Sequence, residues 1–125
     1  MMTKKQMQLA ELIRRHFSDV LREEGYYIYG AAPLVTVTQV QLSPDMSYCT
    51  IYLSIFNADK KAVFQAIEDN TWKLKQSLVA KIRHKLRRMP ELRFRLDETL
   101  DEWQKAEQLV KKYIDGQSDT APDTE

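Results

Sequence analysis

The chain has 125 residues, of which 43% are hydrophobic and 30% are charged, and its formal net charge is +1 at neutral pH. This length and mixture are typical of one soluble globular domain that buries its own core. A single cysteine, Cys49, excludes an intrachain disulfide, and no apolar run of about 18 residues is present to span a membrane. The N-terminus has no signal-peptide pattern, so we expect a cytoplasmic protein without a membrane anchor.

The first predicted element is a helix over residues 3–24. Thr3 is a suitable N-cap, and Gly25 is predicted to end the helix. Residues 26–33 contain a glycine and a proline and have no clear period, so we expect a loop there. The helix has one apolar stripe with spacings of three and four, made by Leu9, Leu12, Ile13, Phe17, Val20 and Leu21.

Two strands are predicted next, over residues 35–42 and 47–56. The alternation of the first strand changes parity, which predicts a bulge near Gln39. Residues 43–45 read Ser-Pro-Asp, which is typical of a turn, and the two strands therefore predict an antiparallel hairpin. The second strand alternates cleanly, with one parity predicted to face the core: Cys49, Ile51, Leu53 and Ile55.

The helical region from Asn57 or Asp59 to Met89 has two apolar stripes rather than one. The stripes are displaced by about 100°, which predicts two consecutive helices, or a sharp kink, with the junction at residues 74–77. Pro90 is predicted to end the second helix. The first stripe is Ala62, Val63, Ala66, Ile67 and Leu74, and the second is Leu78, Val79, Ile82 and Leu86.

A strand over residues 91–97 and a last helix over residues 99–114 complete the pattern. The first six elements follow the order helix, strand, strand, helix, helix, strand. We therefore predict an α+β fold that resembles a type II KH domain, with a kinked helix pair and an added C-terminal helix. Residues 1–115 are expected to form this single domain, and residues 116–125 a disordered acidic tail.

Positive charge is concentrated in the second half of the chain. Between Trp72 and Met89 there are seven lysines and arginines and no acid. Such a surface suits phosphate groups, because each neutralised phosphate releases condensed counterions, although a basic helix face is also often only solvated. The candidate phosphate-binding residues are Lys73, Lys75, Lys81, Arg83, His84, Lys85, Arg87, Arg88 and, at the edge, Arg93.

Catalytic and metal-binding patterns are weak in this sequence. Neither His16 nor His84 has a second ligand at the helical spacing of four, so no metal site is predicted. Cys49 lies on the core parity of its strand, where burial makes a thiol unreactive. The acids that follow residue 96 suit a helix N-terminus better than catalysis. We therefore expect no enzyme activity, no metal and no cofactor.

Four stretches carry a resemblance to a known family. They are QLAELI at residues 8–13, VTVTQVQLSPD with CTIY at residues 35–45 and 49–52, LRRMPELRF at residues 86–94, and DETL at residues 97–100. In these stretches the chain resembles ribosome-binding factor A, a bacterial assembly factor for the small ribosomal subunit. The resemblance extends from residue 6 to about residue 109.

This resemblance implies a KH-like fold in which an Ala-x-Gly kink replaces the GxxG loop. It also implies binding to immature 16S rRNA in the small subunit precursor, a role in late rRNA maturation and cold adaptation, and release aided by an assembly GTPase. Separately from the resemblance, we expect a monomer. The stretch that includes the predicted junction, residues 71–77, contains no Ala-x-Gly, so a kink there must form without glycine. Lys73, Lys75 and Lys81 are expected to supply the charge near this junction.

A second interpretation remains open from the sequence. The same fold could be a protein-interaction module that binds a partner protein through an apolar surface and makes no direct RNA contact. Salt distinguishes the two interpretations, because phosphate binding weakens steeply with added salt and an apolar interface does not.

Overall fold

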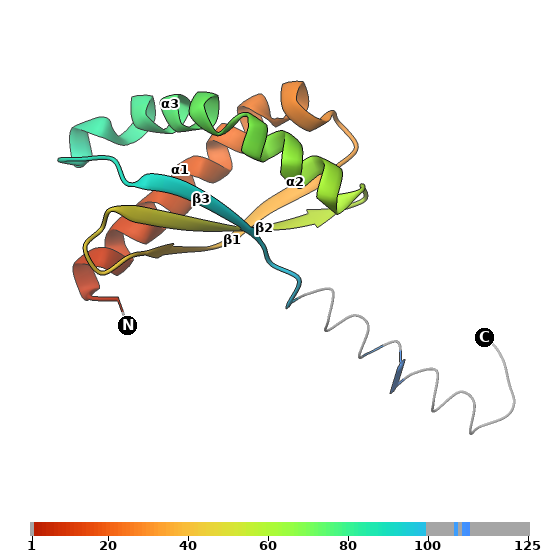
Figure 1. Ribbon diagram of the computed structural model, residues 1–125, viewed down its shortest axis with the longest axis horizontal. Helices are drawn as coiled ribbons and strands as arrows, with labels where there is room; N and C mark the ends of the chain where they lie inside the picture. The colour runs from red at the N-terminus through yellow and green to blue at the C-terminus, as the bar shows by residue number, and fades with distance from the viewer. Residues whose placement is uncertain (1, 100–106, 108, 111–125) are drawn as a thin grey trace, which may run out of the picture.

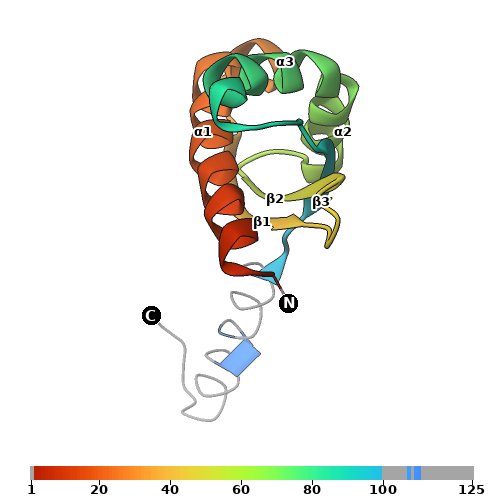
Figure 2. The ribbon, with the colours of Figure 1, turned by 90° about the vertical axis from the view of Figure 1, so that its left-hand side faces the viewer.

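Helix α1 (Lys4–Tyr29) begins the computed structural model, which describes residues 2–99, 107 and 109–110. Strands β1 (Leu34–Leu42) and β2 (Tyr48–Phe56) follow, then helices α2 (Lys60–Asp69) and α3 (Thr71–Ile82), and strand β3 (Glu91–Leu96). All three helices lie on the same face of the sheet (Figures 1 and 2). The predicted α+β class and the order of these six elements are confirmed. The last predicted helix lies mostly outside the described residues, and the tail lies wholly outside them.

A capping box begins α1, as predicted from Thr3. The Thr3 hydroxyl accepts from the Gln6 backbone, and the Gln6 side chain accepts from the Thr3 backbone, so two otherwise unpaired N–H groups are satisfied. The predicted end at Gly25 is wrong, because the helix continues to Tyr29 and ends at Gly30, whose φ is +86°. Gly25 is buried inside the helix, where an added Cβ would collide with the Tyr29 ring. This glycine therefore allows close packing and does not stop the helix.

The sheet has the strand order β1-β2-β3. Strands β1 and β2 are antiparallel and confirm the predicted hairpin, with Val40 opposite Ile51. Their register shifts between Val37 and Gln39, which confirms the predicted bulge. Strand β3 runs parallel to β2, with Phe94 opposite Ile51. A parallel neighbour needs a long crossover, and α2 and α3 provide it.

The core lies between the sheet and the three helices. The predicted inward parity of β2 is confirmed, and the Phe17 ring of α1 lies 5.6 Å from the Phe94 ring of β3. Burial of each large aliphatic side chain contributes roughly 1.5–3 kcal/mol. The side chains with less than 2% exposure include Ile13, Phe17, Val20, Cys49, Ile51, Leu53, Ile67, Leu74, Leu78 and Ile82.

The helix pair is present, but its junction lies at Asn70 and not at residues 74–77. Leu74 belongs to the buried stripe of α3, and the sequence pattern assigns it to the preceding helix because its helical angle coincides with that of Ile67. The junction needs no glycine, since Asn70 has φ −106° and ψ 19°. Its side-chain amide donates to the Ala66 carbonyl at 2.8 Å, and the Thr71 hydroxyl donates to the Glu68 carbonyl at 2.6 Å.

The end of α3 also differs from the prediction. The helix stops at Ile82 and not at Pro90, and a short 3-10 turn, η1 (Arg83–Lys85), follows it. Leu86 is extended, with φ −128° and ψ 140°, because the chain must turn here to enter β3. The Glu91 amide then donates to the Ser47 carbonyl at 2.9 Å, which starts the strand pairing. The basic residues after Ile82 therefore lie in a turn and a connecting segment, not on a helix face.

Candidate nucleic-acid interface

The structure distributes the candidate cations over four elements. None of the nine is fully buried. The sequence predicts Lys81, His84, Lys85 and Arg88 on one solvent face of the second helix, but that helix ends at Ile82, so these four do not share a helix face. Lys73, Lys75 and Lys81 lie on α3; Arg83, His84 and Lys85 lie in η1; Arg87 and Arg88 lie in the segment before β3; and Arg93 lies on β3.

Lys81 is engaged within the fold. Its ammonium lies 3.1 Å from the Glu23 carboxylate of α1, and its side chain is 28% exposed. One turn earlier, the Ser77 hydroxyl donates to the Glu24 carboxylate. These contacts join α3 to α1 and place acidic groups beside Lys81. The ion pair gives Lys81 a structural role, and its charge is partly compensated before any ligand arrives.

Lys73 and Lys75 do not share one surface. Residues two positions apart on a helix differ by about 200° around its axis. Lys73 and Lys75 therefore project from opposite sides of the buried stripe of α3. Lys73 is exposed and Lys75 is half-buried. Trp72, whose side chain is 75% exposed, lies next to Lys73 in the same turn.

Arg93 lies on the sheet face opposite the helices. Its guanidinium carbon Cζ is 3.7 Å from the centre of the Tyr48 ring, a cation–π contact between neighbouring strands β3 and β2. Tyr48 and Tyr52 share this outer face, since their parity is opposite to that of the buried residues. Arg93 is therefore separated by the sheet from the cations on α3.

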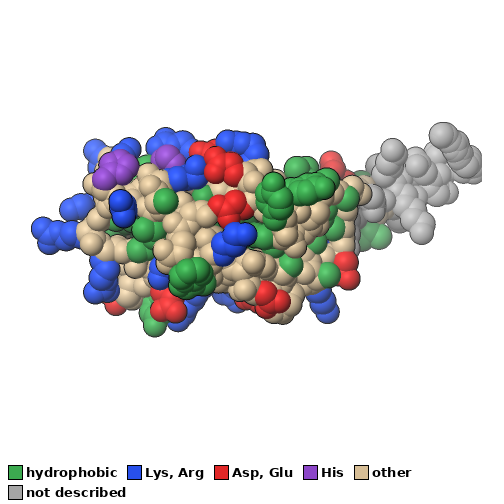
Figure 3. All heavy atoms as spheres, turned by 90° about the horizontal axis from the view of Figure 1, so that it is seen from above, with side chains coloured by type: hydrophobic (Ala, Val, Ile, Leu, Met, Phe, Trp, Pro, Cys, Tyr) green, Lys and Arg blue, Asp and Glu red, His purple; other side chains and the backbone are tan. Residues whose placement is uncertain are grey.

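The remaining cations lie toward one end of the molecule. We use the term basic end for the exposed residues Arg83, His84, Lys85, Arg87 and Arg88, together with Lys4 and Lys5 at the start of α1. Figure 3 shows lysine and arginine side chains gathered at the left-hand end of the molecule, where α1 begins and α3 ends.

The contribution of α1 to this surface was missed by sequence reasoning. Lys5 lines the same groove as Lys85, Arg87 and Arg88, a hollow of about 730 Å³. The available signal was the Lys4-Lys5 pair in the first turn of α1, but nothing local in the sequence brings that turn next to residues 85–88. The proximity is a consequence of the tertiary packing.

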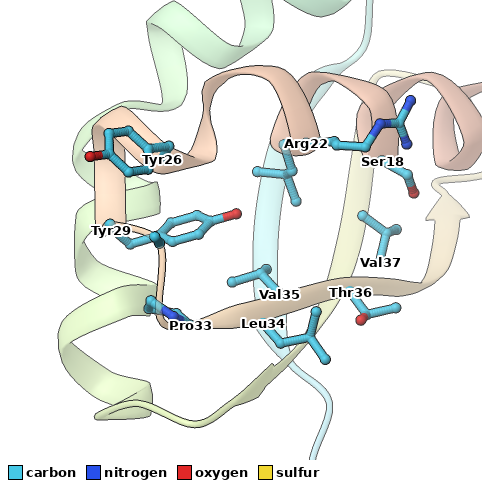
Figure 4. A pocket seen from close by; sticks show the side chains of 12 residues that line it. Ser18, Arg22, Tyr26, Tyr29, Pro33, Leu34, Val35, Thr36 and Val37 are labelled. Atoms are coloured by element: carbon cyan, nitrogen blue, oxygen red, sulfur yellow. The ribbon is translucent and has the colours of Figure 1, made fainter.

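A second hollow, of about 410 Å³, lies between the C-terminal part of α1 and the first half of β1 (Figure 4). Its lining is mostly apolar and includes Tyr26, Tyr29 and Leu34. Arg22, the cation in this lining, forms an ion pair with Asp19, with 2.5 Å between a guanidinium nitrogen and the carboxylate oxygen Oδ1. Tyr26 and Leu34 are more than half exposed. This hollow offers contact to an apolar partner and has little to attract a polyanion.

Cys49 is a free thiol that lies buried on the inner face of β2. Burial raises the pKa of the Cys49 thiol to about 12, so the thiol stays protonated at neutral pH. Within residues 2–99, 107 and 109–110, no three metal-ligating side chains lie close enough together to hold a metal ion. The helices among these residues are too short or too polar to span a bilayer.

Asp97 orders the turn after β3. Its carboxylate accepts from the Thr38 hydroxyl at 2.6 Å and from the Thr99 amide at 3.0 Å.

Fold and surface together define the class of this protein: a small α+β domain, with helices on one sheet face, that presents a basic end suited to an anionic partner. A family model for ribosome-binding factor A matches residues 5–110, and the chain belongs to this family. Ribosome-binding factor A from Chlorobaculum tepidum is 31% identical over 106 residues, which cover 83% of this chain and 86% of the relative.

Known structures of this family share the fold. The crystal structure of ribosome-binding factor A from Thermus thermophilus superposes with a TM-score of 0.61 at 23% identity, over 73% of this chain and 94% of that one. A homology model of the Thermus thermophilus protein, fitted into a cryo-EM map of a 30S complex, gives a TM-score of 0.56 at 25% identity, over 70% of this chain and 90% of that one.

Proposed function

We propose that this chain is a noncatalytic assembly factor that binds immature 16S rRNA in the small ribosomal subunit and promotes its late maturation. The observation that carries this proposal is the exposed basic end on a member of the ribosome-binding factor A family. The Thermus relative that was fitted into a 30S complex supports the small subunit as the partner. Residues 1–115 would act as one KH-like RNA-binding domain, with residues 116–125 as an acidic tail.

The proposed mechanism is differential binding without a chemical step. The cations of the basic end would bind phosphates of a folded rRNA site and release counterions. If the immature conformation presents these phosphates better than the mature one, binding shifts the population toward the immature conformation until release. Release aided by a GTPase, a role in cold adaptation, a cytoplasmic location and a monomeric state belong to the same proposal.

Co-sedimentation with purified immature and mature small subunits, over a salt series, tests this function. We expect the full chain to bind the immature subunit more tightly and to lose affinity steeply as salt rises. Large subunits in the same experiment are the control. Absence of binding to either form of the small subunit at low salt would overturn the proposal.

A protein-interaction role is the second candidate, and a specific observation favours it. At the C-terminal end of α1 and the start of α3, three aromatic side chains are strongly exposed: Tyr26 at 64%, Tyr27 at 79% and Trp72 at 75%. Large exposed aromatic side chains are typical of protein interfaces. If the chain binds the small subunit with no salt dependence, and Tyr27→Ser with Trp72→Ser abolishes binding, this second function replaces the first.

A further inference from the structure

The groove at the basic end combines an apolar floor with a charged rim. Residues from α1, from the β1–β2 turn and from the segment after η1 line it (Figure 2 views this end of the molecule). The apolar side chains are all half-buried, packed against the core on one side and open on the other. They are Leu9, Leu12, Met46 and Leu86.

The rim is strongly biased toward positive charge. Lys5 lies on the α1 side of the groove, and Lys85, Arg87 and Arg88 lie on the other side. The acid on the rim, Asp45, is already used within its turn, since its Oδ1 accepts from the Ser47 hydroxyl at 2.7 Å and from the Ser43 hydroxyl at 2.8 Å. These hydrogen bonds hold the carboxylate in its turn but leave it charged, so the rim carries four cations and one anion and has a net positive charge.

Backbone strain keeps one floor residue in its place. Met46 has a φ of +62°, an unfavourable conformation for a side chain of this type. The turn imposes this conformation, because the Met46 amide donates to the Ser43 carbonyl at 2.8 Å. Such strain persists only where the surroundings enforce it, and it is concentrated at functional sites.

The size and shape of the groove select among anionic ligands. Its volume of about 730 Å³ falls within the range of about 300–1,000 Å³ for pockets that hold small ligands. An amphipathic helix would need a long groove with successive apolar anchors. The floor consists of four side chains, with Lys5 of α1 on one side and Lys85, Arg87 and Arg88 on the other, and this arrangement suits one base with a phosphate on each side of it.

We propose that this groove binds one unstacked nucleotide of single-stranded RNA. The base would lie on Leu12, Met46 and Leu86, and the flanking phosphates would contact Lys5 on one side and Arg87 and Arg88 on the other. Proteins commonly read RNA through bases displaced from the stack. This inference rests on the proposed function and makes it more specific, since it assigns the recognition of an unpaired base to a defined site.

Fluorescence titration of the full chain with two nonameric ribose-phosphate chains tests the proposal. One chain carries a single central adenine and the other carries no base, so the two differ only in the group that would enter the groove. We expect the adenine to tighten binding by about tenfold, because the aliphatic floor would remove apolar surface of the base from water. In Met46→Gly, which relieves the positive φ and removes a floor side chain, the gain should fall below about threefold.

Asn57→Gly is the matched control. Asn57 also has a φ of +62°, but it follows β2 and does not line the groove. This variant should keep the full gain from adenine. Equal affinity of the wild type for the two chains would overturn the groove proposal while salt-dependent subunit binding leaves the proposed function intact. Equal affinity together with displacement of the RNA by an acidic amphipathic peptide would assign the groove to a protein ligand instead.

Discussion

Asp45 shows how one residue orders the turn beside the groove. Hydrogen bonds from the Ser47 hydroxyl, the Ser47 amide and the Ser43 hydroxyl lower the pKa of the Asp45 carboxyl from 3.8 to about 2. The ionised carboxylate is thus the form that the folded turn prefers. Because Met46 follows directly and has a positive φ, this hydrogen-bonded turn also fixes the position of a floor side chain.

The pKa of Asp45 predicts a pH-dependent contribution to stability. A lowered pKa in the folded state stabilises the fold fully above the unfolded value of 3.8, and this contribution disappears as the pH falls through about 2. We expect Asp45→Asn, which keeps an oxygen acceptor but has no charge, to unfold at a lower urea concentration than the wild type at pH 7. The difference should shrink between pH 4 and pH 2. A difference that stays constant over this range would contradict the assignment.

Single residues also mark where sequence reasoning fails. The sequence identifies Thr3 as a cap and the alternating core residues of β2, because these roles depend on local spacing. The prediction of Gly25 as a helix stop is wrong, because only the packing of Tyr29 over it reveals its role. The sequence places Lys81 among the phosphate-binding candidates. Its ion pair with Glu23 cannot be predicted from local spacing, because Glu23 is far away in the chain.

At the scale of elements, the α2–α3 junction is a helix break made by side-chain hydrogen bonds. Asn70 and Thr71 donate side-chain hydrogen bonds to carbonyl groups near the end of α2, where the regular helical hydrogen bonds end. The displacement between the two apolar stripes made it possible to predict that the helix breaks. The position of the break could not be predicted, because Leu74 fits both stripes. The set of basic residues was likewise predictable, whereas their arrangement depends on α3 ending at Ile82.

Removal of the Asn70 side chain tests this account of the junction. We expect Asn70→Ala to lower the free energy of unfolding by about 1 kcal/mol, the typical value of one hydrogen bond, as measured by urea denaturation. Gln65→Ala is the control, because it removes an exposed hydrogen bond to Asp69 in the same helix and should change stability by less than about 0.5 kcal/mol. Equal stability of Asn70→Ala and the wild type would show that this hydrogen bond does not stabilise the junction.

At the scale of the whole molecule, α1 separates two different surfaces. Lys5 belongs to the basic end and Tyr26 to the aromatic hollow, and at 1.5 Å per residue they are about 30 Å apart along the helix. This distance exceeds the Debye length of about 8 Å at physiological ionic strength. The two surfaces can therefore be altered independently, and charge changes at one end leave the field at the other nearly unchanged.

Charge reversal at the basic end tests the central claim most directly. Arg87→Glu with Arg88→Glu changes two exposed side chains of the groove rim, and Lys61→Glu with Arg95→Glu changes two exposed cations that do not line it. The affinity for the immature small subunit, measured by co-sedimentation, should fall by at least about tenfold in the first variant. The slope of log affinity against log salt concentration should decrease by the amount expected for about two lost phosphate contacts. The second variant should bind nearly as the wild type does. Equal binding by both variants would contradict a basic end that holds rRNA.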